Sequence, residues 1–257
     1  MSSSAYDIQE FYSTATGRFV HQAITKQLKQ TTIFDTHNDA SQRHLSLGFG
    51  FPFFEGQEKA SPDFTFLPPE MGLYGWAPNG QDIGKHRSGK NRCGICRITD
   101  LPLPDESVTQ VFMIHCLEFI DDPEMALNEI WRVLHPEGRL IMVVPHRGGF
   151  WASRDTTPFG QGRPYSLSQL KDNLRSENFV CEKTLTALHT PPFKSRIMLN
   201  AFGWAEHLAQ TVPVFPGVFI VEASKKIYNP ITARKKRHPV LLGDKLRWID
   251  TPTPQPG

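Results

Sequence analysis

Apolar residues recur at helical spacing in the first part of the chain. From Ile8 to Leu28 they stand three or four positions apart, which is typical of an amphipathic helix. Gly17 interrupts this pattern, and we predict two short helices separated at this glycine. After a polar stretch, Leu45-Ser46-Leu47 predicts a short buried strand that runs into Gly48-Phe49-Gly50. Pro52 suits the first turn of a following helix, where a missing N–H costs nothing.

The middle of the chain carries the clearest pattern. Residues 108–114 are an apolar run that predicts a strand, and Asp122-Pro123-Glu124 begins a helix with a cap, a proline and an acid in the expected places. The inner face of this helix has apolar side chains at positions i, i+3, i+4 and i+7, which are Leu127, Ile130, Trp131 and Leu134. Pro136-Glu137-Gly138 is expected to end it. Residues 139–145 then read as a strand buried on both faces.

The remaining segments continue the alternation of strands and helices. We predict strands at 63–67, 93–98, 179–185 and 218–223, and helices at 166–178 and 196–208. The helix at 196–208 is interpreted as a core or partner contact, with an acceptor lid or a membrane-surface helix as alternatives. The alternation predicts an α/β fold with an open parallel sheet and helices on both faces.

Composition places the chain among ordinary globular proteins. It has 257 residues, of which 39% are hydrophobic and 21% charged. It contains no run of 18 uncharged apolar residues, and its first residues lack the features of a signal peptide. The four cysteines, Cys93, Cys96, Cys116 and Cys181, are too few for a disulfide scaffold. We therefore expect a cytoplasmic protein without a transmembrane segment.

Charge is concentrated near the C-terminal end. Residues 224–247 contain eight Lys or Arg and one acid, Asp244, so this segment carries +7 within a chain whose formal net charge is +2. Arg234-Lys235-Lys236-Arg237-His238 suits contact with RNA or an anionic lipid, although a solvated charged surface is the more common role of such a run. Residues 251–257, rich in Thr and Pro, are expected to be disordered.

The turn Gly48-Phe49-Gly50 is the first candidate for ligand chemistry. Glycines after a buried strand let the backbone approach a nucleotide, because no Cβ blocks it. A dinucleotide site needs a third glycine three residues on, where this chain has Phe53. A phosphate-binding Gly-x-x-x-x-Gly-Lys-Ser/Thr is also lacking. A cofactor without a diphosphate therefore fits better, and S-adenosylmethionine is one. A tight turn that binds no ligand is the alternative.

Three stretches together resemble the class I S-adenosylmethionine-dependent methyltransferase family, in particular its type-11 group. They are Leu47–Gly50, Leu101–Val108 and Glu129–Leu140, and the resemblance covers the chain from about Tyr12 to Arg147. It implies a Rossmann-like, doubly wound, mostly parallel seven-stranded sheet with helices on both faces. It also implies S-adenosylmethionine as cofactor, with the residues from 11 to 18 in a helix over it. The cofactor-binding residues that it implies are Tyr12, Leu47, Gly48, Phe49, Gly50, Glu70, Asp100, Leu101 and His115.

The family pattern also implies three domain-level segments: an N-terminal helical segment at 1–32, a methyltransferase-like domain at 33–228 and a basic, Pro-rich tail at 229–257. Several positions depart from the pattern. Phe51-Pro52 stands where a small residue is usual, Arg97 and Thr109 replace acids, and Glu70 is the nearest candidate for the acid that binds the ribose.

Further candidates lie after the strand at 108–114 and after the strand at 139–145. His115 could orient the methionyl part of the cofactor or act as a base, and a buried structural histidine is the alternative. Glu118 could cap the next helical segment. In the long loop at 151–166, Trp151, Phe159 and Tyr165 are candidate pocket walls. Cys93-Gly94-Ile95-Cys96 is interpreted as ordinary strand or loop thiols without a metal, because a zinc site needs two more ligands.

The sequence therefore predicts a methyltransferase whose acceptor is unidentified and is more readily a small molecule than a nucleic acid. Methyl transfer mainly needs the acceptor, the methyl group and the leaving sulfur in line, so no catalytic residue is assigned. The alternatives are a non-catalytic binding or regulatory protein with the same fold, and an RNA-directed methyltransferase that uses the basic tail.

Overall fold

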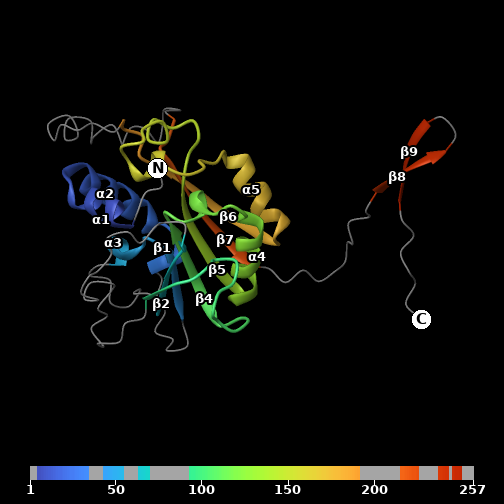
Figure 1. Ribbon diagram of the computed structural model, residues 1–257, viewed down its shortest axis with the longest axis horizontal. Helices are drawn as coiled ribbons and strands as arrows, with labels where there is room; N and C mark the ends of the chain where they lie inside the picture. Colours follow the sequence, from blue (N-terminus) through green and yellow to red (C-terminus); the bar gives the residue numbers. More distant parts are fainter. Residues whose placement is uncertain are drawn as a thin grey trace. The chain divides into compact units, whose positions relative to one another are not determined.

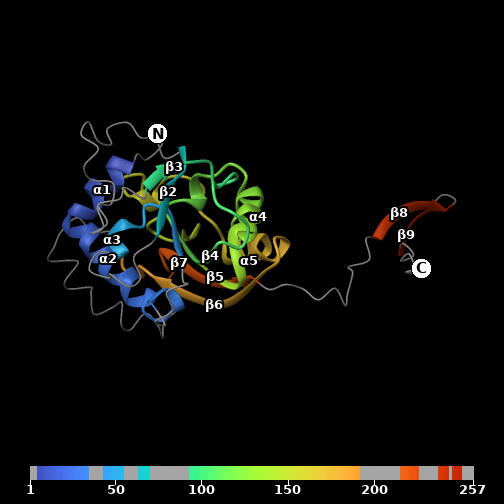
Figure 2. The same ribbon diagram turned by 90° about the horizontal axis from the view of Figure 1, so that it is seen from below.

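The computed structural model describes residues 5–34, 43–54, 63–69, 93–191, 215–225, 237–242 and 245–250. The chain divides into two compact units, residues 1–226 and residues 227–257. The larger unit contains a seven-stranded sheet whose helices lie on both of its faces (Figures 1 and 2). Its helices are α1 (Ala5–Ser13), α2 (Ala15–Leu28), η1 (Thr32–Phe34), α3 (Phe51–Phe54), η3 (Leu117–Phe119), α4 (Pro123–Val133), η4 (Pro158–Gly160) and α5 (Leu167–Ser176).

The order of the strands confirms the predicted Rossmann-like sheet. The strands are β1 (His44–Gly48), β2 (Phe64–Leu67), β3 (Cys93–Ile95), β4 (Val108–Ile114), β5 (Leu134–Pro145), β6 (Phe179–Ala187) and β7 (Val218–Lys225). They are arranged in the order β3-β2-β1-β4-β5-β7-β6. The first five are parallel to one another, whereas β7 runs antiparallel to both β5 and β6. Strand order reverses beside β1, so β1 and β4 flank the switch point of the sheet.

Both faces of the central strands are buried, because alternate side chains enter different cores. On β4, Val111 and Met113 belong to the core under α4 and α5, while Phe112 and Ile114 belong to the core under α1 and α2. This arrangement explains why residues 108–114 and 139–145 read as continuous apolar runs. Helix α4 begins as predicted, with the Asp122 side chain accepting from the Met125 N–H at 3.0 Å.

The break between the first two helices lies at Thr14, so the prediction that Gly17 separates them is wrong. Thr14 caps α2, and its hydroxyl oxygen accepts from the Gly17 N–H at 3.0 Å. Gly17 lies in the first turn of α2, and a Cβ there would meet the Phe11 carbonyl oxygen at 2.0 Å. The glycine is thus required by the close approach of α1 to α2, which the pattern of apolar residues does not reveal.

Other boundaries also differ from the prediction: β5 begins at Leu134 instead of Arg139, and the ends of α5, β6 and β7 differ by two residues. Helix α4 ends at Val133 because Leu134 is already extended and pairs with Val108, and because Pro136 disfavours a helical His135. The third strand ends at Ile95 instead of Ile98. The predicted helix at 196–208 and the terminus at 251–257 lie outside the described residues.

The smaller unit contains a hairpin that the sequence did not predict. Its strands β8 (Arg237–Leu242) and β9 (Lys245–Asp250) pair antiparallel, with Leu242 opposite Lys245.

Candidate functional site

The end of β1 packs directly against the end of β4. Gly48 is in register with Ile114 and has a φ of +77°. A Cβ on Gly48 would meet the Ile114 carbonyl oxygen at 2.2 Å, so only glycine fits here. The Phe49 N–H donates to that same oxygen at 3.0 Å, and the Gly50 N–H donates to the Gly48 carbonyl at 3.1 Å. Because these N–H groups already have partners, the turn does not offer them to a diphosphate.

Tyr12 of α1 lies over this turn. Its ring stacks on Phe49 with centroids 6.2 Å apart and an interplanar angle of 13°, and it meets Phe53 edge to face. The Tyr12 hydroxyl is 2.8 Å from Nε2 of His115. Tyr12 is 9% exposed and His115 fully buried. The structure therefore brings Tyr12 of the first helix into contact with His115 at the end of β4, although the two residues are 103 positions apart in the sequence.

His115 follows β4 in a left-handed backbone conformation with a φ of +48°. Its Nδ1 lies 3.5 Å from Oε1 of Glu118, and neither of these buried atoms has a hydrogen-bond partner. The other carboxylate oxygen of Glu118 accepts from the Cys116 N–H at 3.1 Å. Left-handed conformations of residues other than glycine are strained and gather at functional sites. The backbone of His115 is thus held where its ring reaches both Tyr12 and Glu118.

Burial raises the pKa of Tyr12 well above its ordinary value, and the neighbouring Glu118 raises it further. The phenol is therefore neutral over the physiological pH range and carries a single proton. Since Tyr12 lies beside the nitrogen of His115, the phenol can donate that proton in the Tyr12–His115 hydrogen bond.

The loop after β5 closes this cluster from another side. Phe159 of η4 packs on His115 at 4.8 Å between centroids, and Trp151 packs on Phe159 at 5.9 Å. The Arg163 N–H donates to the Glu118 carbonyl oxygen at 2.7 Å. The third predicted wall residue, Tyr165, lies in the core on the opposite face of the sheet, and its hydroxyl bonds to the Leu117 carbonyl at 3.4 Å.

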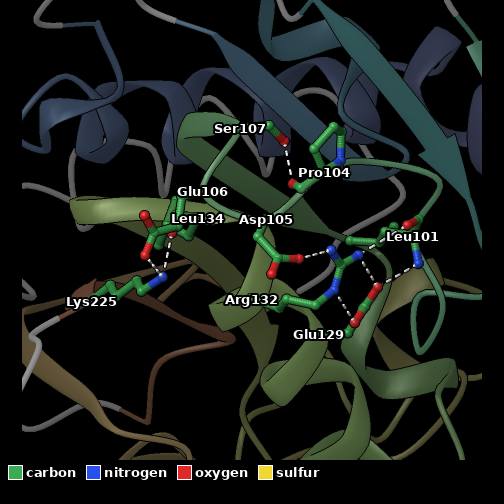
Figure 3. Close-up of polar contacts among 9 residues, drawn as sticks. All are labelled: Leu101, Pro104, Asp105, Glu106, Ser107, Glu129, Arg132, Leu134 and Lys225. Atoms are coloured by element: carbon green, nitrogen blue, oxygen red, sulfur yellow. Dashed lines mark hydrogen bonds and ion pairs between the residues drawn. The ribbon is translucent and has the colours of Figure 1, made fainter.

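A second polar cluster explains why the stretches around Leu101 and Glu129 occur together (Figure 3). The Leu101 N–H donates to Glu129 at 2.8 Å, and Arg132 donates to the Leu101 carbonyl oxygen at 3.2 Å. Arg132 also binds both oxygens of Glu129, at 2.9 Å and 2.6 Å, and it pairs with Asp105. These bonds fasten the 101–108 segment to α4. They are structural contacts, and they occupy both the N–H and the carbonyl oxygen of Leu101.

The structure gathers some of the predicted cofactor residues and separates others. Tyr12, Phe49 and His115 meet around Gly48, whereas Leu47 and Leu101 belong to the core on the other face. Asp100 is exposed, and a Cβ on Gly50 would meet the Ser46 hydroxyl at 2.3 Å. Glu70 lies outside the described residues. Glu118, Phe53 and Phe159 complete the described cluster, and of these only Phe53 had no sequence signal for the site.

The described cysteine of the Cys-x-x-Cys motif has no features of a reactive thiol. Burial raises the pKa of Cys96 to about 11, and Asp100 and Glu129 add to the shift. Its thiol is therefore protonated at neutral pH, which disfavours thiolate chemistry. Among the described residues, no three His, Cys, Asp or Glu side chains gather in a way that could hold a metal ion.

Comparison with known proteins gives consistent results. Residues 77–142 match a family model described as a methyltransferase domain. A probable S-adenosylmethionine-dependent methyltransferase of Mycolicibacterium smegmatis is 34% identical over 94 residues, which are 36% of this chain and 36% of that protein. A demethylmenaquinone methyltransferase of Chlamydia trachomatis is 29% identical over 132 residues, covering 42% of this chain and 53% of its own. The match thus spans about a third to a half of these relatives.

A solved structure extends the similarity of fold to most of the chain. The S-adenosylmethionine-dependent methyltransferase of Thermotoga maritima superimposes with a TM-score of 0.55 at 18% identity, covering 85% of this chain and 94% of the other. None of the helices in the described part of this chain is both long and apolar enough to span a membrane.

Proposed function

We propose that the chain is a member of the class I S-adenosylmethionine-dependent methyltransferase family and that it transfers a methyl group from S-adenosylmethionine to an acceptor, supported by its similarity to a methyltransferase domain model and to known methyltransferases. The observation that carries this proposal is the cluster of Tyr12, Phe49 and His115 at the joined ends of β1 and β4. Ligands of doubly wound sheets bind beyond the carboxyl ends of the strands at this switch point.

The chemistry of the described residues fits this cofactor. S-adenosylmethionine supplies a methyl group on a positively charged sulfonium. Aromatic faces such as those of Tyr12 and Phe159 attract cations, and the buried carboxylate of Glu118 adds negative charge beside them. A diphosphate would instead need free N–H groups or cations, and the Phe49 and Gly50 N–H groups are already bonded. We assign Tyr12, Phe49, Gly48 and His115 to the methionyl side of the cofactor.

The same residues favour a small acceptor over a nucleic acid. The described walls of the cluster are aromatic and buried, and basic side chains that could bind a phosphate backbone are not among them. The low cysteine content suits a reducing compartment, and the cytoplasm is the compartment that we propose.

Calorimetric titration of the full chain with S-adenosylmethionine and S-adenosylhomocysteine tests the proposal. We expect both ligands to bind. Tyr12→Leu should weaken the binding of S-adenosylmethionine more than the binding of S-adenosylhomocysteine. Only S-adenosylmethionine carries the sulfonium charge that an aromatic face attracts. Phe179→Leu, in the core on the opposite face, is the control and should weaken the two ligands equally or not at all. The lack of any binding at millimolar ligand would favour the non-catalytic alternative.

A further inference from the structure

We propose that Tyr12, His115 and Glu118 form a proton relay that deprotonates the methyl acceptor, and that this acceptor is an aromatic hydroxyl compound such as a phenol. The inference rests on the proposed methyltransferase function and names the acceptor chemistry of the same site. It is carried by the arrangement of the three side chains: Tyr12 bonds to one nitrogen of His115, while the other nitrogen faces Glu118.

The first link of the relay is the 2.8 Å hydrogen bond between the Tyr12 hydroxyl and Nε2 of His115. A phenol has one proton to donate and two lone pairs with which to accept. If the phenol donates to Nε2, its lone pairs stay available for the proton of an acceptor. Tyr12 is also the most exposed member of the three, at 9%, compared with 0% for His115 and 2% for Glu118. The Tyr12 hydroxyl is itself buried in the structure without ligand, and in the proposal Tyr12 is the end of the relay that the acceptor meets when it binds.

The second link joins His115 to Glu118. Nδ1 of His115 and Oε1 of Glu118 are both buried, face one another at 3.5 Å and have no hydrogen bond. Buried polar atoms without partners are costly, so such a pair needs an explanation. A proton arriving on the imidazole makes this contact an ion pair, and catalytic contacts are often long until the reacting complex forms. Glu118 thus stabilises the imidazolium and fixes the orientation of the ring, as the acid does in hydrolase triads.

The surrounding backbone holds the relay against the cofactor turn. A Cβ on Gly48 would meet the His115 carbonyl oxygen at 2.8 Å, so the turn and His115 are in close contact. Gly162, with a φ of +79°, lets the loop after β5 approach Glu118, where a Cβ would meet the Glu118 carbonyl at 2.5 Å. The side chains are consequently positioned before any ligand arrives, which is what an efficient proton transfer requires.

The other titratable groups near the relay do not compete for its proton. Among the ion pairs of the described residues, Glu118 pairs only with His115. The guanidinium of Arg163, whose backbone N–H bonds to the Glu118 carbonyl, pairs with Asp121 at 3.0 Å. Burial and Glu118 raise the pKa of Tyr165 to about 12, and its hydroxyl bonds to the Leu117 carbonyl. Cys116 contributes its backbone N–H to Glu118.

A hydroxyl is the acceptor that needs such a relay. A neutral amine attacks with its own lone pair and releases a proton afterwards, whereas a neutral hydroxyl becomes a good nucleophile only as its O–H bond breaks. In the proposed step the acceptor proton moves to the Tyr12 oxygen while the Tyr12 proton moves to Nε2 of His115. The acceptor oxygen gains its bond to the methyl carbon as the carbon–sulfur bond breaks, with its electron pair remaining on sulfur. The dry aromatic surroundings of Phe49 and Phe159 suit an aromatic ring.

Nitrogen NMR of the full chain without ligand tests the relay independently of activity. With ¹⁵N-labelled histidine, and His115→Gln used to assign the signal, we expect the neutral form of the His115 ring to carry its proton on Nδ1. This tautomer leaves Nε2 free to accept from Tyr12. A neutral ring protonated on Nε2 would overturn the proposal, because Tyr12 would then be the acceptor of that bond.

Methyl transfer to phenols of graded acidity tests the acceptor class. With unsubstituted phenol, Tyr12→Phe and Glu118→Gln should lower kcat by about a hundredfold or more. With a nitrophenol that is already ionised at the assay pH, the loss should be much smaller, because no base is needed. Tyr165→Phe removes another buried phenol near Glu118 and is the matched control, expected to keep wild-type rates with every acceptor.

The possible outcomes separate the two proposals. Absence of S-adenosylhomocysteine binding to the wild-type chain contradicts the methyltransferase proposal itself. Cofactor binding without transfer to any phenol overturns the acceptor class. If Tyr12→Phe lowers kcat by the same factor with every phenol of the series, the relay is overturned and Tyr12 is a structural residue.

Discussion

A methyl group on Gly17 would lie 2.0 Å from the Phe11 carbonyl oxygen and 2.5 Å from Cα of Tyr12. The backbone of α1 would have to move away from α2, and Tyr12 would move with it. Glycine in a helix is normally a cost, since alanine is favoured there by about 1 kcal/mol. At this position the close approach of the α1 and α2 backbones makes glycine the favoured residue. The position of Tyr12 in the cluster with Phe49 and His115 depends on this close approach.

Gly17→Ala is therefore expected to destabilise the protein by about 1–3 kcal/mol, the range typical of overpacking, although helix propensity alone predicts a gain. Urea unfolding followed by circular dichroism measures the change. Gln22→Ala on the exposed side of the same helix should alter stability by less than about 0.5 kcal/mol. Stabilisation by Gly17→Ala would show that α1 is not held as closely as described.

Lys225 is a buried cation at the end of β7. Its Nζ donates to the Leu134 carbonyl at 2.7 Å and lies 3.6 Å from Glu106 (Figure 3). It also sits over the ring of Trp131, 4.0 Å from the ring centroid. Burial lowers the pKa of Lys225 below its ordinary value of 10.5, and the pairing with Glu106 only partly offsets this effect. The unfolded chain therefore holds the lysine proton more tightly than the folded chain does.

The unfolded chain keeps the Lys225 proton up to a higher pH than the folded chain. The contribution of Lys225 to the free energy of unfolding therefore rises with pH until about 10.5. The stability of the wild-type chain relative to Lys225→Met, which keeps the length of the side chain, should thus increase from neutral pH towards that value. Denaturant unfolding at several pH values measures the difference. A difference that is constant or falls with pH would mean that Lys225 is not penalised by burial.

At the scale of elements, the 101–108 segment and α4 form one unit through Glu129 and Arg132. The hydrogen bond from Arg132 is the main reason that the pKa of Glu129 is lowered below its ordinary value of 4.5. Arg132 binds Glu129 with two nitrogens, a geometry that lysine cannot reproduce. The orientation of the segment after β3 is therefore set by a side chain of the following helix.

Arg132→Lys should destabilise the protein by about 1–2 kcal/mol at neutral pH, because partial exposure of Arg132 moderates the effect. A depressed acid pKa gives stability above the unfolded value and loses it as pH falls, so the gap between variant and wild type should narrow below pH 4.5. Thermal unfolding of both proteins at pH 7 and pH 4 measures this difference in stability. Arg175→Lys, whose pair with Asp172 is 3.9 Å long and exposed, is the control and should change little.

Elements with an uninterrupted local pattern could be predicted from the sequence, and contacts between distant elements could not. Strand β4 and the cap of α4 matched the prediction because both depend on neighbouring residues. Tyr12 and His115 could each be named as candidates. Their hydrogen bond could not be predicted, because it depends on how α1 packs across 103 positions of sequence. The break at Thr14 was missed because the role of Gly17 is a contact with α1, which leaves no periodic signal.

At the scale of the molecule, all seven strands and both cores belong to residues 1–226, and the hairpin of β8 and β9 belongs to residues 227–257. The proposed cofactor residues and the relay lie in the larger unit. The basic run from Arg234 to His238 lies in the smaller one, so cofactor chemistry and any contact with RNA or anionic lipid are assigned to different units.

A chain ending at Lys226 should therefore melt within about 3 °C of the full chain, equivalent to less than about 1 kcal/mol, and keep its affinity for S-adenosylhomocysteine. Differential scanning calorimetry and isothermal titration measure the two quantities. If the full chain binds RNA or anionic vesicles, this truncation should abolish the binding. Binding that survives the truncation would rule out the basic run as its source.

Strand β7 also has a consequence for biosynthesis. It is the last strand of the larger sheet to be translated, yet it lies between β5 and β6, and β6 pairs with no other strand in the described residues. Until residues 218–225 have left the ribosome, β5 presents an open edge and β6 has no place in the sheet. Nascent chains must therefore be kept from aggregating through nearly the whole of translation, and a premature stop codon just before Val218 should yield a product that is degraded rather than folded.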